Sequence, residues 1–431
     1  MRVVIALLAV TIAACTAQTF GCGSDLKIDG KLRKQFLDYH NQKRRDIVRG
    51  AESNFNRAKN MYKLSWSCDL EKKAQRHIQS CPSQVQGLGS TGANNMMWTI
   101  SGGSFDKSRV EKMIKDTLDK WWEPAKQYRL DADNRYPRHS GLYNVANIIN
   151  AATTKVGCTY NVCGNRMVIL CLYDEIAYIT EKILYDTGNP CTRNEHCTTY
   201  RKSTCDTATG LCVKPDEPRD NGESNMCPPS NGMTDRTRRT ILDLHNDFRS
   251  LVARGQAEDK LIPNGFAPPA ARMLKMEYDC NLEKTAANYA RRCVYAHSLP
   301  QERDNAGENL YTVSMPDAEK IKAGEWATRA WFSELKEFGV GQKNLLEQWL
   351  FDRQKRNPKM KIGHYTQMVW GTTNKLGCGI QNCQNPKQTL VVCHYKQAGN
   401  VMARPPRPIY EVGPPCSKCP QGCTDDKLCI A

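Results

Sequence analysis

The sequence contains one cysteine framework twice. Twelve residues separate Cys68 from Cys81, and twelve residues of similar sequence separate Cys280 from Cys293. A Lys-x-Gly-Cys-x4-Cys pattern likewise ends at Cys163 in the first half and at Cys383 in the second half. A chain of 431 residues is too long for a single compact core. The repeat therefore predicts two copies of one domain.

The first residues have the order of a secretory signal peptide. Arg2 precedes an apolar run and then small residues, so we expect cleavage after Ala17. A lipoprotein signal acylated on Cys15 is the alternative. After the signal peptide we expect a first domain, a cysteine-rich extension, a linker, a second domain and a second extension. The predicted ranges, starting with the signal peptide, are 1–17, 18–190, 191–212, 213–226, 227–413 and 414–431.

The number of cysteines indicates disulfides and an oxidising compartment. The chain has 21 cysteines, and removal of Cys15 with the signal peptide leaves equal numbers in the two halves. We therefore expect a secreted, extracellular protein in which the remaining cysteines form disulfides. These are Cys22, Cys68, Cys81, Cys158, Cys163, Cys171, Cys191, Cys197, Cys205, Cys212, Cys227, Cys280, Cys293, Cys378, Cys383, Cys393, Cys416, Cys419, Cys423 and Cys429. The Cys416-x2-Cys419 spacing also fits half of a zinc site, which is the alternative there.

The charge of the chain limits its partners. The formal net charge is +16, and it divides almost evenly between the two halves. Diffuse positive charge favours weak attraction to anionic glycans or membrane surfaces, and it lacks the clustered pattern of nucleic-acid-binding proteins. We therefore expect no nucleic-acid partner. No later apolar stretch is long enough to span a bilayer, so no membrane span is expected.

Apolar periodicity predicts both helices and strands in each copy. A helical pattern ends at Gly50 in the first copy and at Gly255 in the second, where Thr234 is the expected N-cap. β-prone runs around Cys171 and Cys393 predict buried strands. Each domain is therefore expected to be α+β.

Comparison of the copies separates framework residues from candidate site residues. His40 and His245 occupy the same place in both copies, so we assign them to the framework. Comparison of the aligned segments gives two histidines and two glutamates that the first copy replaces by groups of different chemistry: His297, Glu308, Glu334 and His364. Their counterparts in the first copy are Val85, Ala93 or Asn94, Pro124 and Asn144. The other histidines lack a matching carboxylate set and are expected at the surface: His77, His139, His196 and His394.

Two imidazoles and two carboxylates suit a divalent metal such as zinc. The histidines would be ligands, and the carboxylates would be ligands or would orient the imidazoles. The same set also suits acid-base chemistry on a water molecule. Each residue taken alone could instead be an ordinary surface or core residue. Their joint absence from the first copy favours a site in the second domain.

Two segments resemble the signatures of the CAP superfamily, which comprises cysteine-rich secretory, antigen 5 and pathogenesis-related proteins. The segments are GHYTQMVW, from Gly363 to Trp370, and LVVCHYKQAGNV, from Leu390 to Val401. The His-Asn-x-x-Arg pattern that starts at His245 and the Gly-Glu-Asn pattern that starts at Gly307 add to the likeness. The tandem arrangement with cysteine-rich extensions resembles two-domain secreted proteins of parasitic nematodes.

The resemblance implies an α-β-α sandwich for each domain. It also implies a cleft in the second domain that binds zinc or another divalent cation through His297 and His364, with Glu308 and Glu334 lining the cleft. The implied disulfides of the first domain are Cys22–Cys81, Cys68–Cys163 and Cys158–Cys171. Those of the second domain are Cys227–Cys293, Cys280–Cys383 and Cys378–Cys393. In the first domain Asn144 and Leu172 break both signatures, so there the resemblance supports the fold alone.

Three functions remain open after this comparison. The resemblance favours a secreted, non-enzymatic binding or effector protein at a parasite–host interface, with immunomodulation as its role and no catalytic residues. Its partner would be a host receptor or a lipid or sterol, and a homodimer is also open. The second function is a zinc-dependent hydrolase with Glu308 or Glu334 as general base. The third is a glycan-binding coat protein that acts through positive charge alone.

Overall fold

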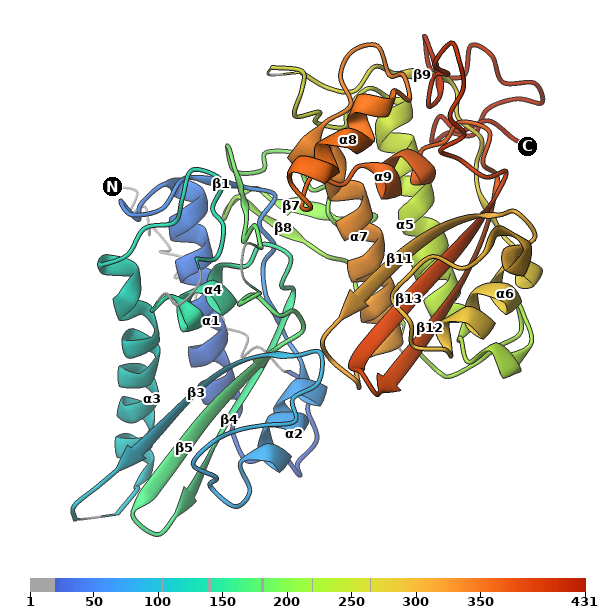
Figure 1. The fold of residues 1–431 in the computed structure, drawn as a ribbon. Helices are drawn as coiled ribbons and strands as arrows, with labels where there is room; N and C mark the ends of the chain where they lie inside the picture. The colour runs from blue at the N-terminus through green and yellow to red at the C-terminus, as the bar shows by residue number, and fades with distance from the viewer. Residues whose placement is uncertain (1–19, 103, 138–140, 180–181, 219, 264) are drawn as a thin grey trace, which may run out of the picture. The chain divides into compact units, whose positions relative to one another are not determined.

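The computed structural model describes residues 20–431 except 103, 138–140, 180–181, 219 and 264. The expected signal peptide and Cys15 lie outside the described residues. The chain divides into two compact units, residues 1–216 and 217–431 (Figure 1). Each unit is described by itself below.

The first unit is built around a mixed four-stranded sheet in the order β2-β4-β5-β3. Strands β2 and β4 are parallel, and the other neighbours are antiparallel. The strands of this sheet are β2 (Ser65–Trp66), β3 (Gly92–Thr99), β4 (Lys155–Cys163) and β5 (Arg166–Tyr173). The helices are α1 (Gly30–Arg49), α2 (Cys68–His77), α3 (Lys107–Trp122), η1 (Glu123–Lys126), α4 (Tyr143–Ile149) and η2 (Asn194–His196). Two small sheets pair β1 (Ala58–Lys59) with β6 (Asp186–Thr187) and β7 (Thr204–Asp206) with β8 (Leu211–Val213).

The second unit repeats this sheet in the order β10-β12-β13-β11, so that β11 is an edge strand. Its strands are β10 (Glu277–Tyr278), β11 (Gly307–Val313), β12 (Lys375–Gln384) and β13 (Lys387–Lys396). A small sheet pairs β9 (Ala270–Arg272) with β14 (Glu411–Val412). The helices are η3 (Pro229–Asn231), α5 (Asp235–Ala253), α6 (Cys280–Ala290), η4 (Pro300–Arg303), α7 (Lys320–Phe338), α8 (Gln348–Arg356) and α9 (Gly363–Met368).

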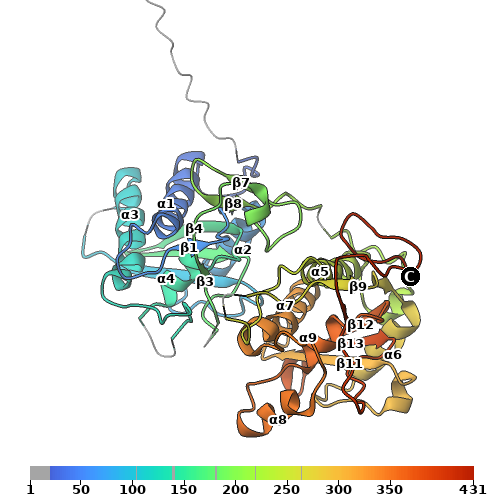
Figure 2. The same cartoon turned by 90° about the horizontal axis from the view of Figure 1, so that it is seen from above.

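Each central sheet is covered by helices on both faces (Figures 1 and 2). Successive residues of a strand point to opposite faces. In β5 the odd-numbered residues from Met167 to Tyr173 join the core under α1, α3 and α4, whereas the even-numbered residues from Val168 to Leu172 pack with Ala74 of α2. Strand β13 alternates in the same way between the core of α5 and α7 and the smaller cluster of α6. This arrangement confirms the predicted α+β fold with one α-β-α sandwich in each domain.

The two predicted long helices have the expected ends. The side chain of Asp29 accepts a hydrogen bond from the backbone N–H of Leu32 and begins α1, and Gly50 ends it with a φ of 69°. Thr234 accepts from the N–H of Thr237 and begins α5, as the sequence predicts. Gly255 follows α5 with a φ of 67°. The backbone is left-handed at the C-terminal ends of both helices, which explains why glycine is found at these two positions.

The His-Asn-x-x-Arg residues of both domains are buried framework. The imidazole of His245 donates from Nδ1 to the carbonyl of Ile241 (2.8 Å) and accepts at Nε2 from the hydroxyl of Tyr395 (2.9 Å). His40 makes the same two contacts in the first domain. Arg249 is fully buried and donates to backbone carbonyls, among them those of Met368 and Trp370. These bonds fix the end of α9, which carries one of the predicted metal ligands.

Ten disulfides join cysteines of the described residues, and they correct part of the implied pairing. Cys158–Cys171 and Cys378–Cys393 pair as the resemblance implies. The other four implied pairs are wrong, because the structure instead has Cys22–Cys68, Cys81–Cys163, Cys227–Cys280 and Cys293–Cys383. Cys68 and Cys280 begin α2 and α6, whereas Cys81 and Cys293 follow the opposite ends of these helices. A helix of ten residues is about 15 Å long, so the cysteines at its two ends meet different parts of the domain.

The extensions are also closed by disulfides: Cys191–Cys205, Cys197–Cys212, Cys416–Cys423 and Cys419–Cys429. The structure therefore overturns the zinc alternative for Cys416 and Cys419, because cysteine binds zinc as a thiolate and these two sulfurs are in disulfides.

Candidate metal centre

Glu308 lies on the edge strand β11 with both carboxylate oxygens hydrogen-bonded. Its Oε1 accepts from Nδ1 of His297 (2.7 Å) and from the backbone N–H of Ser298 (2.9 Å). Its Oε2 accepts from the hydroxyl of Ser298 (2.7 Å) and from Nε2 of His394 (3.1 Å). Burial opposes ionisation of this group, but the hydrogen bonds outweigh burial and hold the pKa of Glu308 well below its ordinary value. Glu308 is therefore a carboxylate that orients His297.

Glu334 lies on α7 and orients His364 in the same way. Its Oε1 accepts from Nδ1 of His364 at 2.5 Å. Its Oε2 accepts from the backbone N–H groups of His364 (3.1 Å) and Tyr365 (3.0 Å). These N–H groups belong to the first turn of α9, which has no capping side chain of its own at Ile362. Glu334 therefore orients the histidine and caps the helix that carries it.

The two predicted ligands, His297 and His364, have the same arrangement. In each imidazole, Nδ1 donates a hydrogen bond to a buried glutamate. Among the described residues, Nε2 of neither histidine has a hydrogen bond. The side chain of His297 is 63% exposed and that of His364 is 18% exposed. A carboxylate that holds one ring nitrogen fixes the tautomer in which the other nitrogen binds a metal. The donor set therefore fits a divalent cation held by two imidazoles, with the glutamates behind them.

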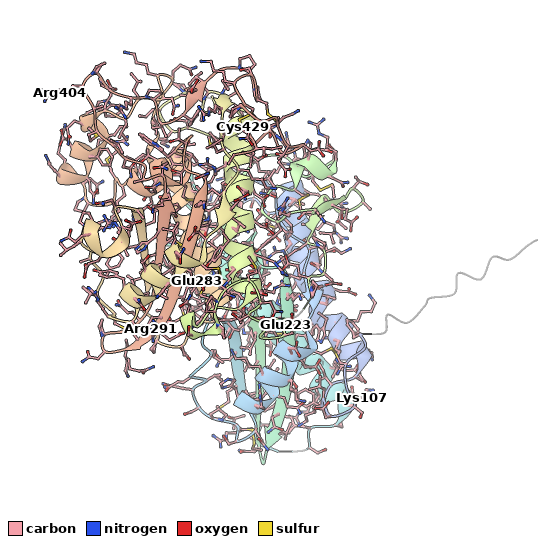
Figure 3. All side chains as sticks on the ribbon, turned by 90° about the vertical axis from the view of Figure 1, so that its right-hand side faces the viewer. Lys107, Glu223, Glu283, Arg291, Arg404 and Cys429 are labelled. Atoms are coloured by element: carbon pink, nitrogen blue, oxygen red, sulfur yellow. A yellow bond between two sulfur atoms is a disulfide. The ribbon has the colours of Figure 1, made fainter. Side chains whose placement is uncertain are left out.

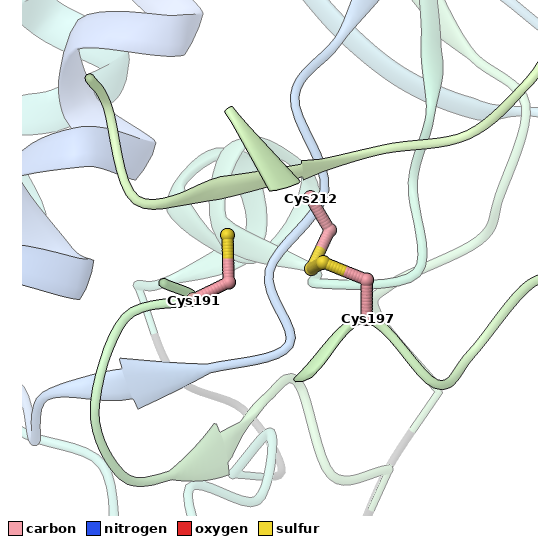
Figure 4. Close-up of side chains that lie close together, drawn as sticks. All are labelled: Cys191, Cys197 and Cys212. Atoms are coloured by element: carbon pink, nitrogen blue, oxygen red, sulfur yellow. A yellow bond between two sulfur atoms is a disulfide. The ribbon is translucent and has the colours of Figure 1, made fainter. Parts of the chain in front are cut away.

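The four residues do not form a closed metal cluster. Within the described ranges, the sets of three or more potential ligands whose atoms lie within 4.8 Å of one another consist of cysteines. One set is Cys191, Cys197 and Cys212 (Figure 4), the other lies in the second extension, and the cysteines of both are in disulfides. A cation on His297 and His364 would thus keep coordination positions for water or for a ligand.

His394 is a residue of this site that the sequence interpretation missed. The prediction that it lies at the surface is wrong, because its side chain is buried in β13. Its Nδ1 is hydrogen-bonded to the hydroxyl of Thr285 on α6 (2.8 Å), and its Nε2 donates to Glu308. Burial lowers the pKa of His394, and the contact with Glu308 opposes that shift. With both nitrogens engaged, His394 positions Glu308. The replacement of His394 by Leu172 in the first copy is the sequence signal that points to it.

The first domain has the same backbone arrangement at this place, but it lacks the ionisable side chains. The strand register places Ala93 opposite Leu172, as it places Glu308 opposite His394, so Ala93 is the counterpart of Glu308. The Nδ2 of Asn94 donates to the carbonyl of Asn144 (3.0 Å), just as Asn309 donates to the carbonyl of His364 (3.1 Å). Helix α3 ends at Trp122, and Pro124 lies in the following 3-10 turn, whereas α7 continues to Phe338.

The comparisons with known proteins agree with this fold. The sequence model of the cysteine-rich secretory protein family, CAP, matches residues 37–173 and 242–395. The chain therefore belongs to the CAP family, with two copies of the domain. It is 44% identical over 433 residues to the Ancylostoma secreted protein of Ancylostoma caninum, covering 98% of this chain and 97% of that protein.

Two crystal structures extend the comparison. That of Na-ASP-1 is 42% identical and matches with a TM-score of 0.70, covering 96% of this chain and 100% of its own. That of NaASP2 with Zn²⁺ is 47% identical and covers 47% of this chain and 99% of its own, with a TM-score of 0.43. The protein is a secreted, two-domain CAP protein, and a related structure, that of NaASP2, contains Zn²⁺. Among the described helices, none is long and apolar enough to cross a bilayer.

Proposed function

We propose that the second domain binds zinc or another divalent cation through His297 and His364, and that the chain acts as a binding or effector protein at a parasite–host interface. One observation carries the proposal: Nδ1 of each histidine donates a hydrogen bond to a buried glutamate, which leaves Nε2 available to bind a metal. A bound cation would supply a Lewis acid with open coordination positions, to which an oxygen or nitrogen of a ligand could bind.

The hydrogen bonds of the glutamates favour binding over hydrolysis. A general base needs a carboxylate oxygen that can reach the proton of a water molecule. Both oxygens of Glu308 accept hydrogen bonds from His297, Ser298 and His394, and both oxygens of Glu334 accept from His364 and Tyr365. These bonds position the imidazoles and occupy the groups that a hydrolase would use.

Apolar side chains beside His297 support a partly apolar partner. Val294, Tyr295 and Leu299 are 49%, 47% and 57% exposed, and they belong to the same short segment as His297. Exposed apolar groups that cluster next to a polar site are typical of binding surfaces. We infer that the partner is a host receptor or a lipid or sterol. Mass spectrometry of the natively secreted protein would detect a carried lipid, and its absence would favour the receptor.

Calorimetric titration of the whole mature chain with zinc tests the metal site. We expect one site per chain. His297→Ala and His364→Ala should each weaken binding by at least about tenfold, because each removes one of two ligands. His196→Ala is the matched control, since His196 is exposed in the first domain. Full affinity in the double variant would overturn the site. Zinc-dependent cleavage of an ester or peptide that Glu308→Gln or Glu334→Gln abolishes would favour the hydrolase.

A further inference from the structure

Five cations of the second domain lie on two segments of the chain that contain no acidic residue. Arg356 ends α8, and Lys359 and Lys361 follow in the loop that leads to α9. Arg404 and Arg407 lie in the segment after β13. All are exposed except Lys361, which is half-buried, and among the described residues none of the five side chains has a hydrogen bond or an ion pair. We call these five residues the basic face.

Hydrogen bonds of Asn400 join the two segments of the basic face. The side chain of Asn400 donates to the carbonyl of Gly363 (2.8 Å) and accepts from the hydroxyl of Thr366. Seven residues further on, the carbonyl of Arg407 accepts from the backbone N–H of Leu346 (2.8 Å). Residues 400–407 therefore run from the start of α9 to the residues that precede α8. Figure 3 labels Arg404 at the outer surface of this domain.

Acidic residues are missing from both segments. Neither residues 353–370 nor residues 397–410 contain an aspartate or a glutamate. The nearest carboxylate along the sequence, that of Asp352, is paired with Lys355 at 2.8 Å and also interacts electrostatically with Arg356. In the first domain the chain ahead of α4 and the chain after β5 do contain acidic residues, namely Asp131, Asp133, Asp174 and Glu175. Since both domains share one fold, the fold itself does not require the basic face.

Prolines restrict the segment that carries the two arginines. Pro405, Pro406 and Pro408 alternate with Arg404 and Arg407. Each proline ring fixes one backbone torsion angle, so a ligand that binds these arginines orders less of the backbone on binding. Unpaired arginines on a restrained segment bind anionic groups more strongly than arginines already held in salt bridges.

We propose that the basic face binds a linear sulfated glycan. Such a chain carries many sulfate groups, each with one negative charge, and the five unpaired cations can contact several of them at once. A secreted protein also meets such glycans outside the cell. An anionic membrane is the competing ligand, because Val401 and Met402 beside Arg404 are 45% and 44% exposed. Two apolar side chains are, however, far fewer than the apolar face by which surface helices enter a bilayer.

Heparin binding by the whole mature chain tests this proposal. The measurements are made with EDTA present, so they do not depend on the metal site. We expect Lys359→Glu combined with Arg404→Glu to raise the Kd for a heparin fragment at least about tenfold, because attraction to a polyanion depends on the number of contacting cations. The matched control is Arg76→Glu with Arg166→Glu, which makes the same change in net charge at exposed residues of the first domain.

The control should change the Kd less than about twofold, since distant exposed charges are screened by salt. An equal loss of affinity in both double variants would overturn the proposal, because the attraction would then be diffuse. Absence of heparin binding by the wild-type chain would also overturn it. Binding to phosphatidylserine vesicles without binding to heparin would assign the basic face to a membrane instead. Circular dichroism of each variant confirms that it is folded.

Discussion

Glu308 and His394 lie directly opposite each other on strands β11 and β13, where the first domain has Ala93 and Leu172 in the same register. Ala93 and Leu172 belong to an apolar cluster that packs against α2. In the second domain an ionisable pair occupies this buried place, which is stable because hydrogen bonds satisfy it. Thr285 holds His394 from one side, and His297 and Ser298 hold Glu308 from the other. One backbone thus supports either an apolar pair or a hydrogen-bonded ionisable pair.

Replacement of His394 tests its positioning role. We expect His394→Leu to fold, because Leu172 fills the same place in the first domain, and to weaken zinc binding by about 10- to 100-fold through the loss of an outer-shell partner. Calorimetric titration measures the affinity, and circular dichroism checks the fold. His394→Gln, whose amide can still donate to Glu308, should recover part of the affinity. If His394→Leu binds zinc as tightly as wild type, His394 has no such role.

The sequence predicted the fold well because its signals are local and repeated. Apolar periodicity and the helix ends at Gly50 and Gly255 are properties of adjacent residues, and they agree with α1 and α5. His297 and Glu308 were found because the first copy lacks them, and the structure brings them to 2.7 Å. The first copy also lacks His394, where it has Leu172, but the burial of His394 and its contacts depend on strand register and on Thr285 of a distant helix, which no local pattern shows.

The disulfide pairing shows a second limit of the sequence. The same number of residues separates the cysteines at the two ends of α2 and at the two ends of α6. The repeat therefore cannot show which of the two cysteines forms a disulfide with the N-terminal segment of its domain. The structure joins Cys22 to Cys68, with 5.4 Å between their Cα atoms, and joins Cys81 to Cys163 at 6.2 Å. Pairing is set by the direction in which the helix packs on the sheet, which is a tertiary property.

Peptide mapping without reduction tests these pairs. We expect one cross-linked peptide that contains Cys22 and Cys68 and another that contains Cys227 and Cys280. Partial digestion at the lysines and arginines between Cys68 and Cys81 separates the two ends of α2, so the two possible pairings give peptides of different mass. A peptide that joins Cys22 to Cys81 would contradict the structure.

Removal of the Glu334 carboxylate should destabilise the second domain. Glu334→Ala leaves the backbone N–H groups of His364 and Tyr365 without their acceptor. Loss of such buried hydrogen bonds costs about 2 kcal/mol. For a domain of this size that corresponds to a decrease of roughly 4–8 °C in the Tm of its unfolding transition. Scanning calorimetry measures the shift. Glu337→Ala is the control, because the half-buried Glu337 of α7 accepts from the hydroxyl of Ser333 and not from the backbone of α9, so its loss should change the Tm less. An unchanged Tm in Glu334→Ala would refute the capping role.

Acid should destabilise both domains through their buried histidines. Burial lowers the pKa of His40 and of His245 to about 4. The unfolded chain takes up these protons near pH 6.5, whereas the folded chain stays unprotonated until about pH 4. The free energy of unfolding therefore falls between pH 6.5 and pH 4, by about 3 kcal/mol for each histidine, and this contribution is constant below pH 4.

Denaturant unfolding measured across this pH range checks the effect. His245→Gln removes the titrating group from the second domain, so the unfolding transition of that domain should depend less on pH. The transition of the first domain, which keeps His40, is the internal control. A second-domain transition with the same pH dependence in His245→Gln and in wild type would show that other groups cause it.

Anomalous X-ray scattering at the zinc absorption edge, from crystals of the whole mature chain grown with zinc, tests the metal site most directly. The account predicts one strong peak per chain, at the imidazoles of His297 and His364, and none at Asn144 or elsewhere in the first domain. A peak in the first domain of similar height, or a second-domain peak that persists at the same place in the His297→Ala, His364→Ala double variant, would contradict it.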